Sequence, residues 1–160
     1  MVADDRSRRV SDVPTPASAP RADTGEQTAC FVVGSLRLEL SAAPGAARLV
    51  VADDGSRDIY VVEPNALAIW AAATARLMTL MPALQQSDRV EYRTPYLIDR
   101  EGRASIAFEG LVSEQSVSYR LLVTGAESKV AGLMTTGEIV RQVSEAAVGA
   151  VAVARAAVRP

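Results

Sequence analysis

Polar and apolar residues alternate with a period of two in several parts of the chain, a pattern typical of strands that are buried on one face. The clearest example is 35–41, Ser-Leu-Arg-Leu-Glu-Leu-Ser, which alternates without interruption. Ala43-Pro44-Gly45 breaks the pattern. We expect a second strand over 48–52, a hairpin turn over 53–56 and a third strand over 58–62. The first half of the chain is therefore predicted to be a three-stranded meander.

A helical pattern follows this meander. Pro64 and Asn65 open it, and the residues of one expected buried face then recur at spacings of three and four. These residues are Leu67, Trp70, Ala71, Thr74, Leu77, Met78 and Met81. The stretch over 66–84 is apolar enough to suggest a membrane span, but Arg76 lies inside it and Pro82 lies near its end. We therefore predict a buried helix that ends near Pro82, and no membrane partner.

The second half of the chain repeats this order of elements. The predicted elements are a strand over 90–98, a turn over 99–102, a strand with Ala104, Ile106 and Phe108 facing inward, a loop over 110–115, a strand over 117–123 and a long helix from about 127 to 158. Two strand-strand-strand-helix repeats make the chain an α+β protein.

The first residues lack any apolar periodicity, which begins only near Cys30. Proline, alanine, serine and charges of both signs dominate this segment, so burial cannot offset the entropy lost on ordering it. We expect a disordered tail over 1–28. The rest, 29–158, fits one domain, with repeat one over 29–84 and repeat two over 88–158.

The composition excludes several kinds of chemistry. Seventeen basic residues against nineteen acidic ones leave a net charge of -2, so any anion site has to be local. The chain has no histidine, which removes most catalytic triads and zinc sites. Cys30 has no cysteine partner and is expected to be a small buried hydrophobe. Since the sequence also lacks a phosphate-loop pattern, we expect a binding protein, no enzyme, and neither a cofactor nor a metal.

Three short motifs resemble those of a known superfamily. They are Phe31-x-x-Gly34-x-x-Arg37 leading into a strand, Pro64 with Trp70 at the start of the helix, and Asp99-Arg100-Glu101-Gly102-Arg103, which is similar to the first turn of a Pur repeat. Over about 30–145 the chain resembles the superfamily of Pur-alpha, Whirly and positive cofactor four. The resemblance implies a curved antiparallel sheet, backed by helices, that binds single-stranded nucleic acid.

The alternation itself also predicts a basic sheet face. If the leucines face the helices, the opposite face carries the candidate binding residues Arg37, Arg48, Tyr60, Arg93, Arg103 and Arg120, with Ser105 and Ser118. Guanidinium groups pair with phosphates, and Tyr60 would offer one ring for base stacking. Glu39, Asp58 and Glu91 have the same parity and would neutralise the arginines on an ordinary solvated face. The sequence leaves both interpretations open.

The end of the last predicted helix suggests a second function. The run 146–154 has no charged or hydrogen-bonding side chain, so it needs a covering surface. A second subunit would make the protein a homo-oligomer, with a dimer as the commonest closed form; otherwise the run packs inside its own subunit. The alternative function is therefore a protein-interaction or assembly subunit. The polar N-terminus lacks a secretory pattern, so we expect a cytoplasmic protein.

Overall fold

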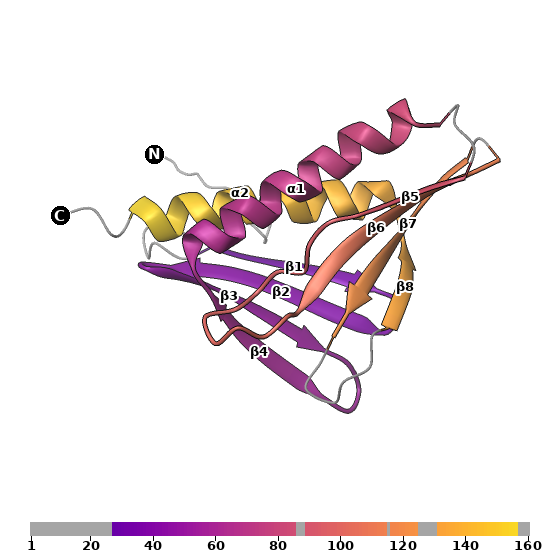
Figure 1. Ribbon diagram of the computed structural model, residues 1–160. Helices are drawn as coiled ribbons and strands as arrows, with labels where there is room; N and C mark the ends of the chain where they lie inside the picture. The colour runs from indigo at the N-terminus through magenta and orange to yellow at the C-terminus, as the bar shows by residue number, and fades with distance from the viewer. Residues whose placement is uncertain (1–26, 86–88, 115, 125–130, 157–160) are drawn as a thin grey trace, which may run out of the picture.

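The computed structural model describes residues 27–85, 89–114, 116–124 and 131–156, and these form two halves of four strands and one helix (Figure 1). The first half contains β1 (Gln27–Val33), β2 (Leu36–Ala43), β3 (Ala46–Ala52), β4 (Arg57–Val62) and α1 (Pro64–Ala83). The second contains β5 (Val90–Arg93), β6 (Ile106–Ser113), β7 (Ser116–Val123), β8 (Ala131–Thr135) and α2 (Gly137–Ala156). Each group of four strands forms its own antiparallel meander. The α+β class is confirmed.

Each half has four strands where the sequence predicted three. In the first half the additional strand is β1, which a turn at Gly34 with φ 59° separates from β2. Gly34 fits this left-handed conformation because it has no Cβ. The predicted tail overlaps this strand, since Gln27 and Thr28 belong to β1. The rest of that tail, 1–26, lies outside the described residues.

Three boundaries in the second half differ from the prediction. The expected start of the last helix, 127–130, lies outside the described residues, but 131–135 form β8, which pairs with β7, and α2 begins only at Gly137. Thr136 supports this start, because its hydroxyl accepts a hydrogen bond from the Ile139 N–H (3.2 Å). The loop expected over 110–115 is wrong in its first part, since β6 continues to Ser113. The strand expected over 90–98 ends at Arg93.

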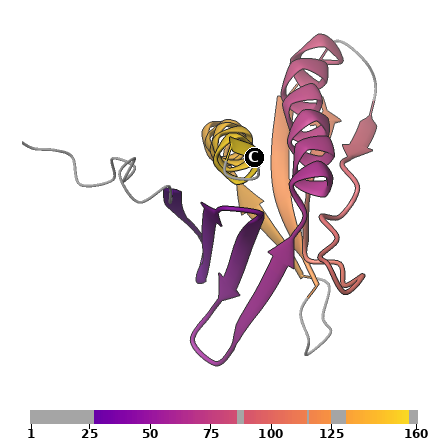
Figure 2. The same cartoon turned by 90° about the vertical axis from the view of Figure 1, so that its left-hand side faces the viewer.

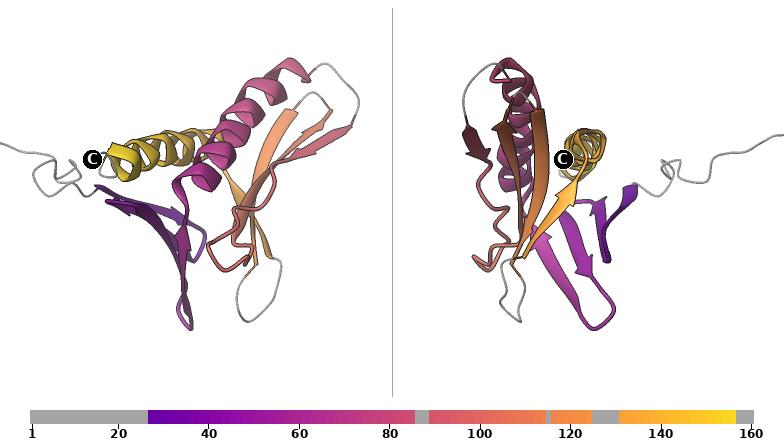
Figure 3. Two further views of the ribbon diagram at one scale, coloured as in Figure 1. Left: turned by 60° about the vertical axis from the view of Figure 1, so that its left-hand side comes forward. Right: turned by 90° about the vertical axis from the view of Figure 1, so that its right-hand side faces the viewer.

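Each helix packs mainly on the sheet of the other half. Figures 2 and 3 show α2 lying over the first sheet and α1 running along the second. The helices are neighbours and antiparallel, since the Arg155 guanidinium donates to the Asn65 side chain (2.7 Å) and the Ser144 hydroxyl donates to the Ala71 carbonyl (3.3 Å). The core therefore lies between both sheets and both helices, so neither half is complete without the other.

The apolar stripe predicted on α1 is confirmed. Leu67, Trp70, Ala71, Thr74, Leu77 and Met81 are buried, and Met78 is half-buried. The helix is long and apolar enough to cross a membrane by length and composition alone. Its buried stripe is nevertheless part of the common core, with Trp70 packed against Phe108 of β6 at 5.9 Å between ring centroids.

The apolar run of α2 is covered largely by its own chain. Val151 and Ala154 are buried, as are Ala147 and Ala150. These side chains lie inside the subunit, as the alternative in which the run packs inside its own subunit requires. Within the described part of this run, the large apolar side chain that remains exposed is Val148, at 58%.

Candidate nucleic-acid interface

The first sheet has a face that points away from the helices, which we call the outer face. The register places its residues in three rows that cross β1 to β4. The rows are Thr28, Ser41, Arg48 and Val61; then Cys30, Glu39, Val50 and Ile59; then Val32, Arg37, Ala52 and Arg57. Two predicted site residues, Arg37 and Arg48, therefore share one surface, and Arg57 joins them.

The three arginines of the outer face have no ion-pair or hydrogen-bond partner among the residues that the structure describes. Arg37, Arg48 and Arg57 are all exposed. Glu39 is the one carboxylate in the three rows, and it lies beside Cys30. Cys30 is itself exposed, which corrects the expectation that it is a buried hydrophobe. Partial desolvation and the neighbouring Glu39 together raise the pKa of its thiol. The outer face thus carries more positive than negative charge.

Arginines elsewhere in the described chain are mostly paired. Arg100 pairs with Glu63, Arg103 with Asp99 and Arg141 with Glu138 and Glu145. Each of these guanidinium groups is neutralised by a carboxylate of the same molecule. An arginine in such a pair contributes little to the attraction of an external anion, so the excess charge of the outer face is a local feature.

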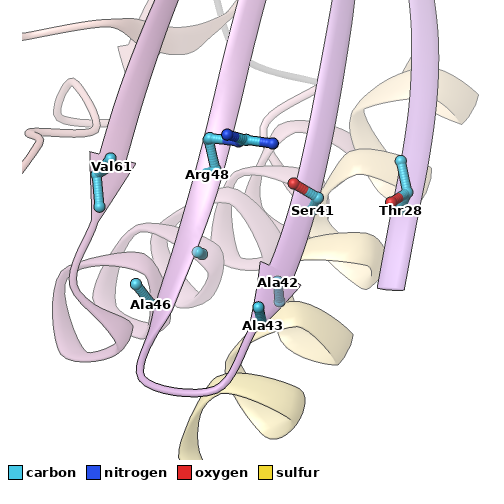
Figure 4. Close-up of a pocket in the computed structure, with 8 residues that line it drawn as sticks. Thr28, Ser41, Ala42, Ala43, Ala46, Arg48 and Val61 are labelled. Carbon is cyan, nitrogen blue, oxygen red and sulfur yellow. The ribbon is translucent and has the colours of Figure 1, made fainter. Parts of the chain in front are cut away.

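A hollow of about 340 Å³ opens at one end of the outer face (Figure 4). Its polar side chains are Thr28, Ser41 and Arg48, which come from three successive strands. Figure 4 shows the Arg48 guanidinium reaching from β3 toward Ser41 on β2, with the helices behind the sheet. Alanines at the hairpin between β2 and β3 leave the space open. Among the described residues, no aspartate or glutamate lines this hollow.

Arg93 and Arg120 lie on the second sheet instead. They share one cross-strand row with Glu109, which stands between them on β6. Arg120 donates two hydrogen bonds to the Glu109 carboxylate, one of them at 2.9 Å, and the Glu109 side chain is only 12% exposed. The alternative interpretation, a face on which cross-strand pairs balance the charges, describes this row well.

The remaining two predicted site residues, Tyr60 and Arg103, lie neither on the outer face of the first sheet nor in the row of Arg93 and Arg120 on the second sheet. Tyr60 stands opposite the buried Leu49, so its ring points into the core and is not available for stacking. Its hydroxyl donates to the Thr124 carbonyl (3.1 Å). Arg103 follows the turn after Asp99 and is bound to that carboxylate at 2.8 Å. Both placements correct the expectation from strand parity.

Ser105 and Asp58 were also expected on the outer face and lie elsewhere. Ser105 is fully buried, and its hydroxyl donates to the Leu97 carbonyl (2.8 Å). Asp58 stands opposite the buried Val51 and shares its inward side. Since Asp58 does not face the arginines, it does not neutralise them, which removes one of the three carboxylates that the sequence placed there.

The sequence analysis missed Arg57. It opens β4 and stands opposite Ala52, which in turn stands opposite Arg37. Its position directly after the predicted turn over 53–56 was the available signal, because the first residue of a returning strand continues the alternation of that strand.

No family model matches this chain, and neither a curated protein nor a solved structure is similar to it at a significant level.

Proposed function

We propose that this is a non-catalytic binding protein that holds single-stranded nucleic acid on the outer face of its first sheet. One observation carries the proposal: Arg37, Arg48 and Arg57 share that face and have no carboxylate partner among the described residues. Exposed guanidinium groups bind phosphates with two parallel hydrogen bonds. Three of them on one surface favour an anion that carries several charges.

The spacing of the arginines favours an extended ligand. Arg37 and Arg57 are two strands apart, which corresponds to roughly 10 Å, and the row of Arg48 lies four residues further along, roughly 13 Å. A single small anion cannot contact all three groups unless the three side chains converge on it over such distances. A chain of phosphates can, because it places several charges along one path.

Exposed apolar side chains between the arginines favour a single strand over a duplex. Val32 is 63% exposed and lies in the row of Arg37 and Arg57, and Ile59 is 38% exposed and lies in the middle row, between the two rows that carry the arginines. A duplex turns its bases inward, whereas a single strand can lay them on such positions. Among the described residues, these three rows hold no aromatic side chain, so phosphate contacts supply most of the affinity and the sequence preference is weak.

A salt titration tests the proposal. Labelled single-stranded DNA and RNA are titrated with the full chain at several salt concentrations and followed by fluorescence anisotropy. Three phosphate contacts predict a log–log slope of about -2, which is a loss of roughly 20-fold in affinity between 50 and 200 mM salt. Absence of binding at 50 mM salt, or an affinity that does not change with salt, contradicts the proposal.

Two exposed side chains on the helices favour the second candidate, an assembly subunit. Ile69 of α1 is 69% exposed and Val148 of α2 is 58% exposed. The helix contacts at Asn65–Arg155 and Ala71–Ser144 bracket both residues, so they lie at the same level of the helix pair. Light scattering tests this candidate, since a mass of 16.9 kDa at micromolar concentration excludes a stable homo-oligomer.

A further inference from the structure

We infer that the hollow at Thr28, Ser41 and Arg48 is a subsite for one phosphate group. The inference depends on the proposed function in one respect, namely that the phosphate belongs to a single-stranded nucleic acid. The three polar side chains stand directly opposite one another in a single row across β1, β2 and β3. Their backbones are therefore about 4.8 Å apart from strand to strand.

This row matches the size of a phosphate group. An oxyanion above Ser41 would have the Arg48 guanidinium on one side and the Thr28 hydroxyl on the other. Figure 4 shows the Arg48 side chain already directed toward this place. The volume of about 340 Å³ lies at the lower end of the range for small-ligand sites, roughly 300 to 1,000 Å³. A phosphate with part of its sugar fits such a space.

The polar groups of the row are available for a ligand. Within the described part of the chain, neither hydroxyl and no nitrogen of the guanidinium has a hydrogen-bond partner. Elsewhere hydroxyls of the same kind are engaged: Thr124 donates to Ala104 and Ser116 donates to Ser113. Two hydroxyl donors and a planar guanidinium are the groups that recognise phosphate oxygens.

The charge of the hollow favours an anion over a cation or a neutral molecule. Its eight lining residues include one arginine and no carboxylate. A second hollow at the opposite end of the outer face differs in this respect, since Arg37 shares it with Asp53 and Asp54. The two carboxylates oppose an anion there. Arg48 is therefore the arginine of the outer face whose surroundings suit a phosphate best.

The first test uses inorganic phosphate as the probe. The side-chain Nε–H signals of arginine are followed by nuclear magnetic resonance in the full chain, and an Arg48→Gln variant assigns the Arg48 signal. We expect this signal to shift in a saturable manner at millimolar phosphate, while the Arg57 signal hardly moves. A nucleoside 5′-monophosphate should give the same pattern. Equal and unsaturated shifts at both arginines overturn the inference, because they indicate only an ionic atmosphere.

The second test compares variants for the affinity of single-stranded DNA. Arg48→Gln should weaken binding by roughly tenfold and Ser41→Ala by about threefold, whereas the control Arg57→Gln, on the same face but outside the hollow, should lose about twofold. Arg48→Lys keeps the charge but loses the planar fork, so it should fall between wild type and Arg48→Gln. All three positions are exposed or half-exposed, which leaves folding intact.

The outcomes separate the subsite from the proposed function. If DNA binds but Arg48→Gln weakens it no more than Arg57→Gln does, the subsite is wrong and the nucleic-acid face stands. If inorganic phosphate saturates the Arg48 signal while no oligonucleotide binds, the subsite stands. It then serves a small phosphorylated molecule, and the proposed function is wrong.

Discussion

The Arg103 guanidinium carbon lies 4.9 Å from the centroid of the Tyr60 ring. This cation–π contact joins the two halves of the chain, because Tyr60 belongs to β4 and Arg103 follows the turn of the second half. Arg103 also donates to the Ile59 carbonyl (2.9 Å), and the Arg100 N–H donates to the Val61 carbonyl (2.8 Å). The turn thereby covers the edge of β4, which among the described strands has no partner on that side.

Replacement of Arg103 by alanine should destabilise the protein without weakening nucleic-acid binding. The variant leaves the Asp99 carboxylate, whose side chain is 1% exposed, without its guanidinium partner, and it removes the contact with Tyr60. We expect a loss of about 2 kcal/mol in the free energy of unfolding, measured in urea. The control Arg141→Ala removes a pair that is exposed on α2 and should cost less than about 0.5 kcal/mol. Equal costs for both variants would show that the turn does not hold the halves together.

Stability should fall in acid through Asp99. Burial alone would raise the pKa of this carboxyl, but hydrogen bonds from the backbone and side chain of Arg103 and from the Glu101 N–H outweigh it and hold the pKa below its ordinary value. The contribution of Asp99 is therefore present above about pH 4, the value of the unfolded chain, and is lost as the pH falls through the folded pKa. Urea unfolding should show a steeper loss below pH 4 for wild type than for Asp99→Asn. Parallel curves would contradict this role of Asp99.

Gly110 should not tolerate alanine. A Cβ at this position in β6 would lie 2.6 Å from Cγ of Met81, a side chain that is fully buried and cannot move aside. Such overpacking costs about 1 to 3 kcal/mol. Gly55→Ala is the control, because a Cβ there has no heavy atom within 4 Å. In thermal or urea unfolding, Met81→Ala should relieve part of the cost of Gly110→Ala, and strictly additive losses would refute the close approach.

Trp70→Ala should cost about 3 to 5 kcal/mol of unfolding free energy. The indole is 2% exposed, packs against Phe108 and lies in the stripe predicted from the sequence. Its neighbour Ile69 points to solvent, so Ile69→Ala should change stability by less than about 0.5 kcal/mol. An unchanged melting temperature for Trp70→Ala would show that the stripe is not buried.

The sequence predicted elements well where one face is apolar and the other polar. β2 alternates cleanly, so its position and the direction of Arg37 follow from the pattern. β4 could not be oriented in this way, since Ile59, Tyr60, Val61 and Val62 are apolar on both faces. This ambiguity placed Tyr60 and Asp58 on the wrong side. Arg103 lies outside the strands, where parity does not determine the direction of a side chain.

The remaining differences between the sequence-based expectations and the structure arise from tertiary contacts. The apolar run of α2 suggested a partner subunit because the sequence does not show that the first sheet and the other helix pack against α2. The predicted loop over 110–115 included Gly110, whereas this glycine lies in β6 and makes room for Met81. The hollow at Arg48 depends on the cross-strand register of three strands, which alternation within a single strand does not define.

A comparison of variants with matched charge tests the central claim most directly. Arg37→Gln/Arg48→Gln removes two charges from the outer face, and Arg76→Gln/Arg93→Gln removes two exposed charges from α1 and the second sheet. Binding of labelled single-stranded DNA at 50 mM salt should weaken by roughly tenfold or more in the first variant and by about twofold in the second. Equal losses in the two variants would show that net charge, and not the outer face of the first sheet, determines the affinity.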